Sequence, residues 1–144
     1  MQKALQVAKS AILRDEVPVG AVLVDYKNNK IISSGSNTVI EDSDPTAHAE
    51  INIIRAACRE KLSTHLDDCD IYITLEPCAM CAQAISNARI RRIYYGAYDP
   101  KSGGVDHGAR VLESSSCHHK PEVYGGILEK ECSDLLVGFF KSKR

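Results

Sequence analysis

The chain has 144 residues, of which 44% are hydrophobic and 26% are charged, and its formal net charge is -1. This length suits one compact domain, so we expect residues 1–144 to form a single domain. The near-neutral charge excludes a protein that is basic over its whole surface, so an RNA partner would have to be held by a local patch. The apolar runs, such as residues 17–24, are too short to cross a bilayer, and the N-terminus lacks the pattern of a secretion signal. We therefore expect a cytoplasmic protein with no membrane segment.

The first part of the chain alternates between helical and extended patterns. Apolar residues recur at helical spacing in residues 2–14, which predicts an amphipathic helix. Residues 17–25 and 31–37 have extended patterns on either side of the turn "YKNNK", and together they predict a hairpin. The segment "DPTAHAEINIIRAACREK" begins with Asp-Pro-Thr, a helix-start signature, so it predicts a helix over residues 44–61.

The second part continues the alternation. Its expected elements are a buried strand at 70–75, a helix at 78–90, a strand at 91–99, a glycine-rich loop at 100–108, a short strand at 121–124 and a closing helix at 127–144 with a basic end. Helices that alternate with strands predict an α/β fold, in which a central mixed sheet of five strands carries helices on both faces.

The motif "TLEPCAMC", residues 74–81, forms a C-x-x-C pair from Cys78 and Cys81. In a reducing compartment such a pair indicates metal binding or catalysis more than a structural disulfide. A redox dithiol needs only the pair itself, but it leaves the nearby His-x-Glu motif unexplained. A structural zinc site needs four protein ligands, and the other four cysteines are scattered singly. A catalytic zinc site needs only three protein ligands and keeps one position open for water.

The motif "TAHAE" supplies a third ligand, His48, at the start of the preceding predicted helix. The partial positive charge of helix N-termini favours the thiolate form of Cys78 and Cys81. Glu50 lies two residues from His48 and is placed to exchange protons with a zinc-bound water without binding the metal. H-x-E followed by P-C-x-x-C is the signature of zinc nucleobase deaminases. We therefore expect one Zn²⁺ per chain, held by His48, Cys78 and Cys81, with Glu50 as the proton shuttle.

Six segments resemble one known family over nearly the full chain: "EVPVGAVLV", "DPTAHAEI", "YITLEPCAMCAQAI", "ARIRRIYYGAYDPKSGG", "GILEKECSDLL" and "FFKSKR". They are similar to the cytidine deaminase superfamily, and more narrowly to bacterial tRNA-specific adenosine deaminases. The resemblance implies a three-layer αβα fold, a homodimer, and conversion of adenosine to inosine at the wobble position of a tRNA anticodon stem-loop of the tRNA-Arg type. In that reaction a zinc-bound water would attack C6 of the flipped adenine, with Glu50 moving the protons.

The same resemblance implies roles around the substrate. Asn37 would hydrogen-bond the flipped nucleotide, and the backbone of Ala49 would face the base. Asp99 would approach the ribose or the RNA backbone, and Phe140 would help to shape the surface for the anticodon loop. Glu76 would support the metal ligands.

Each of these roles has a structural alternative. Asn37 and Asp99 are also typical turn residues. Phe140 could pack into the core together with Phe139, because one face of the closing helix must be buried. Glu76 could be a surface carboxylate at the end of a strand.

The zinc motif alone identifies only the superfamily, so two other functions stay open. One is deamination of a free base or nucleoside, guanine or cytosine, on the same fold. The other is a zinc protein that binds RNA without catalysis, although Glu50 argues against it because a binding module has no need of a carboxylate beside an open metal position.

Overall fold

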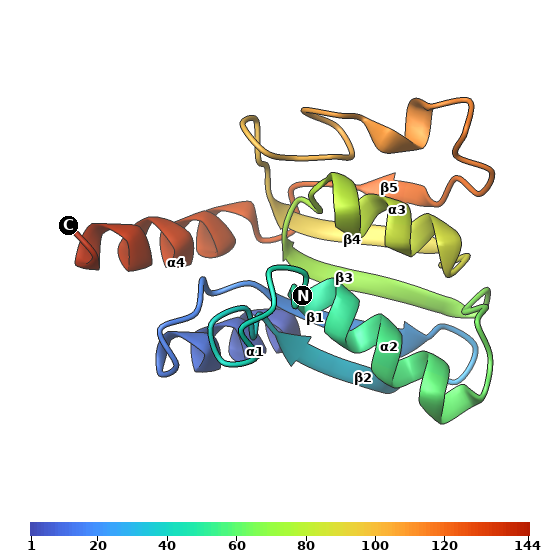
Figure 1. The fold of residues 1–144 in the computed structure, drawn as a ribbon, viewed down its shortest axis with the longest axis horizontal. Helices are drawn as coiled ribbons and strands as arrows, with labels where there is room; N and C mark the ends of the chain where they lie inside the picture. Colours follow the sequence, from blue (N-terminus) through green and yellow to red (C-terminus); the bar gives the residue numbers. More distant parts are fainter.

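A mixed five-stranded sheet forms the centre of the molecule, which a computed structural model describes over residues 1–144 (Figure 1). The strands are β1 (Gly20–Asp25), β2 (Lys30–Ser36), β3 (Cys69–Leu75), β4 (Arg92–Ala97) and β5 (Glu122–Tyr124). Their order in the sheet is β2-β1-β3-β4-β5. β1 pairs antiparallel with β2 and β3, whereas β3, β4 and β5 run parallel. The predicted mixed sheet of five strands is confirmed.

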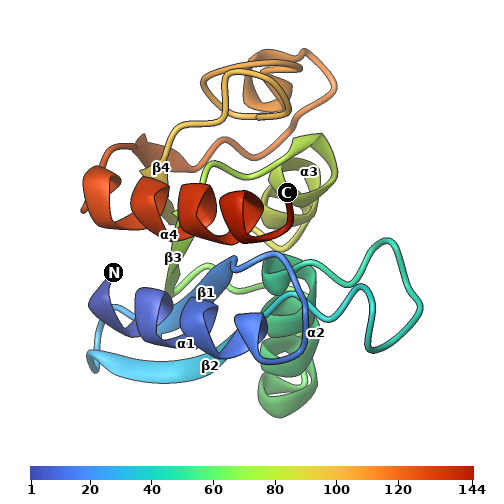
Figure 2. The same ribbon diagram turned by 90° about the vertical axis from the view of Figure 1, so that its left-hand side faces the viewer.

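Two helices cover each face of this sheet. The helices are α1 (Gln2–Ile12), α2 (Ala49–Lys61), α3 (Ala79–Asn87) and α4 (Glu129–Ser142), with a short 3-10 helix, η1 (Val111–Glu113), after β4. In Figure 1, α2 and α3 lie in front of the sheet, and Figure 2 shows α1 and α4 next to each other. None of these helices has both the length and the hydropathy that a bilayer crossing needs.

Separate apolar clusters join each helix pair to the sheet. The larger core contains buried side chains of α2 and α3, such as Ile53 and Ile85, against Ile71 and Ile93 of the sheet. On the other face, a small cluster unites α1 and α4 with the end of β4: Leu5, Ala97 and Cys132. The core therefore fixes the N-termini of α2 and α3 on one face, beside the ends of the strands that lead into them.

Some element boundaries differ from the predicted ones. α2 begins at Ala49 and not at Asp44, because the Asp44 carboxylate accepts hydrogen bonds from the backbone N–H and the hydroxyl of Thr46 and holds a separate turn. α3 ends at Asn87, and Arg89 follows with a positive φ of 57° that a helix cannot contain. β1 begins at Gly20, three residues after the predicted strand start.

Candidate metal and substrate site

Two helix N-termini meet at the site. His48 is the N-cap residue of α2, and Cys78 is the N-cap residue of α3, both with extended backbone angles. Cys81 lies one turn into α3 and is fully buried. The sheet brings the helices together because β3 leads directly into α3 and both helices pack on the same face. The partial positive charge at both helix N-termini favours the thiolate forms of Cys78 and Cys81.

The three predicted ligands form a cluster that fits a zinc ion. His48 Nδ1 lies 3.6 Å from the sulfur of Cys78 and 3.6 Å from the sulfur of Cys81. All three ligand atoms lie within 4.8 Å of one another. A tetrahedral ion with ordinary Zn–S and Zn–N bonds places neighbouring ligand atoms about 3.5–3.8 Å apart. Two sulfurs and one imidazole nitrogen are also a donor set that zinc prefers, and they leave a fourth position free of protein.

The ionisation of the cluster also suits a metal. A hydrogen bond from the Cys81 thiol, with a further one from His48, lowers the pKa of Cys78 to about 4. The pKa of Cys81 rises because its thiol is the donor in that hydrogen bond, and the hydrogen bond to Cys78 also raises the pKa of His48. The group thus holds protons that a cation would displace on binding.

Glu50 lies beside this cluster in the first turn of α2. Its side chain is 4% exposed, and burial raises the pKa of its carboxyl to about 7. It does not belong to the group of three ligand atoms. A carboxyl with a pKa near neutrality can both accept and return a proton, which is what general acid–base catalysis requires.

A cavity of about 360 Å³ opens onto His48, Glu50 and Cys78. This volume lies at the small end of ligand pockets and is suited to a compact ligand such as a nucleobase. Its remaining walls come from the α1–β1 link (Glu16, Val17, Val19), the end of β2 and the loop that follows (Asn37, Val39, Ile40), the end of β3 (Leu75, Glu76) and the segment after β4 (Asp99, Ser102).

The structure brings two of the predicted substrate residues into this cavity. Asn37 lines it and uses Oδ1 to accept a hydrogen bond from the backbone N–H of Ala49 (2.9 Å). Asp99 also lines it, and its carboxylate receives the N–H groups of Lys101 and Ser102 in a local turn. Asn37 and Asp99 therefore have both a structural contact and a place at the cavity.

The other two predicted substrate residues lie outside the cavity lining. Ala49 is fully buried, and its backbone N–H donates a hydrogen bond to Asn37. Phe140 is 49% exposed and lines a separate shallow groove on α4, whereas Phe139 is 7% exposed and packs inward. The alternative that both phenylalanines pack into the core is thus correct for Phe139 and wrong for Phe140.

Glu76 organises the glycine-rich loop. It is 2% exposed, so the alternative of a surface carboxylate is wrong. Its Oε1 accepts hydrogen bonds from the backbone N–H groups of Asp106 (2.9 Å) and His107 (2.8 Å). Its Oε2 accepts one from the N–H of Asp99 (3.0 Å) and faces Nδ1 of His107 at 2.9 Å. One buried carboxylate therefore fastens both ends of the segment 99–107.

That loop reaches the metal cluster. Gly103 forms an isolated β-bridge with Cys78, and the N–H of Gly104 donates to the carbonyl of Pro77 (2.8 Å). A Cβ atom on Gly103 would lie 2.5 Å from the carboxylate of Glu76, so only glycine fits between the two. Glu76 makes no hydrogen bond to His48, Cys78 or Cys81 itself, but the loop that it fastens contacts Cys78.

Sequence reasoning missed Glu16 as part of the site. Glu16 is the first residue of the segment "EVPVGAVLV" and was assigned no role from the sequence, but its side chain is 1% exposed and lines the cavity. The available signal was an acidic residue directly before a buried apolar run.

Comparisons with known proteins agree with the fold and the site. Residues 1–97 match the family described as the cytidine and deoxycytidylate deaminase zinc-binding region. The chain is 51% identical to the "tRNA-specific adenosine deaminase" of Agrobacterium fabrum over 144 residues, which are 100% of this chain and 93% of the relative.

Two solved structures have a similar fold. One, from "Biochemical and Structural Studies of A-to-I Editing by tRNA:A34 Deaminases at the Wobble Position of Transfer RNA", superposes with a TM-score of 0.91 at 51% identity and covers 94% of this chain and 97% of that chain. A guanine deaminase from Bacillus subtilis superposes with a TM-score of 0.65 at 29% identity, covering 95% and 89%.

The three-layer fold and the His-Cys-Cys cluster define the class of zinc-dependent deaminases with the cytidine-deaminase fold, as the sequence motifs predicted. The full-length match is more specific. The chain belongs to the cytidine and deoxycytidylate deaminase family and, within it, to the tRNA-specific adenosine deaminases.

Proposed function

We propose that residues 1–144 act as one zinc-dependent deaminase domain that hydrolyses adenosine to inosine and ammonia at the wobble position of a tRNA anticodon stem-loop of the tRNA-Arg type. The observation that carries the reaction is the buried Glu50 carboxyl beside His48 and Cys78 at a nucleobase-sized cavity. The choice of substrate is supported by the family to which the chain belongs. All six cysteines are free thiols, which agrees with a cytoplasmic location.

The chemistry follows from the residues at the cavity. When bound by His48, Cys78 and Cys81, zinc supplies a Lewis acid that brings the pKa of a coordinated water close to neutrality. Glu50 takes a first proton from the attacking water and delivers it to N1 of the adenine as the water oxygen bonds to C6. It then takes the second proton from the new hydroxyl on C6 and gives it to the amine, which leaves as ammonia when the C6–N bond breaks. Burial of Glu50 keeps bulk water from competing for that proton.

Asn37 orients the nucleotide. Because its Oδ1 is already bonded to Ala49, the amide N–H₂ is the part of the side chain that remains for the substrate. It would donate to an acceptor on the purine or the ribose. The carboxylate of Asp99, which also lines the cavity, would accept a hydrogen bond from a ribose hydroxyl. Phe140, on the exposed face of α4, would contact the anticodon loop outside the cavity.

A tRNA anticodon suits this site energetically. The wobble base lies in a single-stranded loop, so turning it into the cavity costs less than extrusion from a duplex. Recognition then depends on loop shape, stacking and 2′-hydroxyl contacts. Lys101 is exposed two residues from Asp99 and can meet a phosphate near the cavity.

The first experiment is a deamination assay of the zinc-loaded protein on an arginine-tRNA anticodon stem-loop with adenosine at the wobble position. We expect inosine at that position only, detected by mass. Free guanine, cytosine, cytidine and adenosine are tested in parallel, and we expect no turnover of them. Turnover of free guanine with a silent stem-loop would favour the guanine deaminase function instead. Binding of the stem-loop without any turnover would instead indicate a zinc protein that binds RNA without catalysis.

We also propose that the protein is a homodimer that associates through α2 and α3. These helices expose a shallow groove on the face away from the sheet, lined chiefly by Ile51, Ile54, Arg55, Cys58, Ala84 and Ala88. Apolar side chains gathered on one face of two helices are typical of a two-fold interface.

Light scattering tests the dimer directly. We expect a mass twice that of the 15.8 kDa chain. Ile54→Asp places a charge in the groove and should give a monomer with a retained fold, because Ile54 is only partly buried in the single chain. The control is Lys61→Gln, at the far end of the same helix, which should remain dimeric. A monomeric wild-type protein at micromolar concentration would contradict the proposal.

A further inference from the structure

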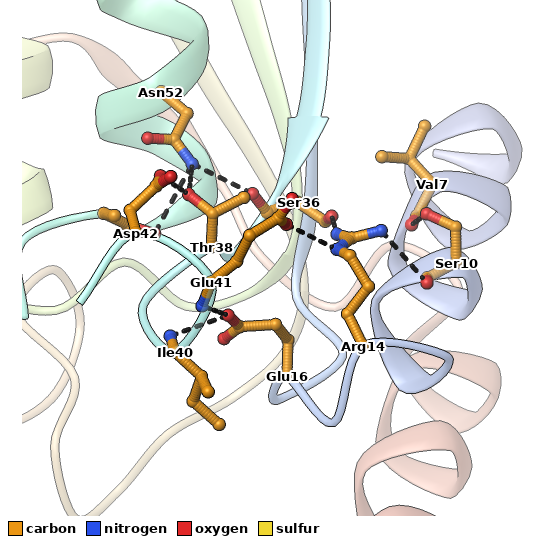
Figure 3. Close-up of polar contacts among 11 residues, drawn as sticks. Val7, Ser10, Arg14, Glu16, Ser36, Thr38, Ile40, Glu41, Asp42 and Asn52 are labelled. Carbon is orange, nitrogen blue, oxygen red and sulfur yellow. Dashed lines mark hydrogen bonds and ion pairs between the residues drawn. The ribbon is translucent and has the colours of Figure 1, made fainter. Parts of the chain in front are cut away.

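The loop between β2 and α2, residues 37–48, forms one wall of the cavity and leads into His48 and Glu50. Its tip is attached to the link between α1 and β1 by Glu16 (Figure 3). Oε1 of Glu16 accepts a hydrogen bond from the backbone N–H of Ile40 (2.7 Å) and a second from that of Glu41 (3.0 Å). A carboxylate that is 1% exposed thus holds two consecutive amides of the tip.

A second attachment lies closer to the surface. Arg14 donates to the hydroxyl of Ser36 (2.7 Å) and pairs with the carboxylate of Glu41 (2.9 Å). The side chains of Arg14 and Glu41 are 35% and 53% exposed, so solvent screens their ion pair and it contributes little to stability. Of the two attachments, the buried one through Glu16 is the stronger.

The base of the loop is held separately by α2. Asn52 donates to the carbonyl of Ser36 (3.0 Å) and to the hydroxyl of Thr38 (3.0 Å), as Figure 3 shows. Thr38 in turn donates to the carboxylate of Asp42 (2.6 Å). These contacts fix where the loop starts, whereas Glu16 fixes how close its tip lies to β1.

The held segment is the apolar wall of the cavity. Val39 and Ile40 both line it, and Ile40 is 59% exposed, so packing against the protein covers less than half of this residue. A nucleotide in the cavity would meet this wall on the side opposite Asp99. If the tip moves away from β1, the wall is lost while His48, Cys78 and Cys81 keep their places.

We propose that Glu16 is a positioning residue that holds the Val39–Ile40 wall against the cavity and thereby sets the affinity for the target nucleotide. The proposal rests on the proposed function for its substrate. It assigns Glu16 no part in the proton transfers. Oε2 of Glu16 accepts no hydrogen bond from the protein, so a direct contact from Oε2 to the substrate is the competing role.

Two substitutions separate these roles. Glu16→Ala removes the acceptor, and we expect KM for the stem-loop to rise about tenfold or more while kcat changes less than about threefold, since binding and not the chemical step is affected. Glu16→Gln keeps a carbonyl oxygen that can accept both amide hydrogens, so it should return KM to within about twofold of wild type. The control Glu41→Gln loses the exposed ion pair but keeps the backbone amide, and it should behave as wild type.

Hydrogen exchange gives a readout that does not depend on activity. The amides of Ile40 and Glu41 should exchange faster in Glu16→Ala and at the wild-type rate in Glu16→Gln, with one zinc per chain in both. Equal impairment of both variants would overturn positioning in favour of a direct contact. Unchanged exchange and KM in Glu16→Ala, or a fall in kcat alone, would also overturn it. A wild-type protein that turns over no RNA overturns the proposed function, and the exchange rates still decide whether Glu16 holds the wall.

Discussion

Replacement of Glu50 by glutamine is expected to abolish turnover of the stem-loop, with a fall in kcat of about 10²- to 10⁴-fold, the usual contribution of one general acid–base group. Glutamine has nearly the same volume and can still hydrogen-bond, but it cannot accept and return a proton. Because Glu50 is a buried carboxyl whose pKa burial raises to about 7, the neutral amide should not destabilise the fold.

The measurement combines single-turnover kinetics with zinc analysis and thermal unfolding. We expect one zinc per chain and a Tm equal to or above that of wild type in Glu50→Gln. Glu60→Gln, an exposed position on the same helix, is the matched control and should keep full activity. A Glu50→Gln enzyme that retains more than a tenth of the wild-type rate would show that another group moves the proton.

Cys81→Ala should lose zinc, activity and stability together. Cys81 is fully buried and is one of the three predicted protein ligands, so the two that remain fall short of the three that a catalytic zinc site uses. A metal that binds only the folded chain stabilises it by about 4 kcal/mol when its concentration is 1,000 times Kd. We expect a comparable loss in the free energy of unfolding.

A chelator identifies the source of that loss. It should lower the Tm of wild type toward that of Cys81→Ala and leave the variant unchanged. Cys58→Ala is the control, because this thiol lies on α2 outside the metal cluster, and the variant should bind one zinc. One zinc per chain in purified Cys81→Ala would refute the ligand assignment.

The main elements of the fold were predictable because they depend on local patterns. Alternating and helical periodicities place all five strands and four helices in the right order. The boundary of α2 was wrong because Asp44 bonds to Thr46 and holds a turn, while the N–H of Ala49 bonds to Asn37, twelve residues away. The first contact is local but competes with helix formation, and the second depends on how β2 packs against α2.

The clustering of His48, Cys78 and Cys81 was predictable for a different reason. His48 and the cysteine pair lie in short motifs whose spacing belongs to the chemistry of one site, and each motif starts a helix. Their convergence still requires the sheet, which aligns the two helix N-termini and brings His48 Nδ1 to 3.6 Å from both sulfurs.

Residue type and spacing were sufficient to predict the alternation of helices and strands, a donor set suited to zinc and the carboxylate beside it. Which polar residues build the cavity depends instead on how the whole chain packs. Glu16 holds an amide 24 residues away and Glu76 one 30 residues away, and Phe139 is buried while Phe140 faces solvent. The spacing in the chain between a buried carboxylate and its N–H partners follows no pattern. A buried carboxylate accepts hydrogen bonds from whichever N–H groups the packing of the sheet and its loops brings within reach.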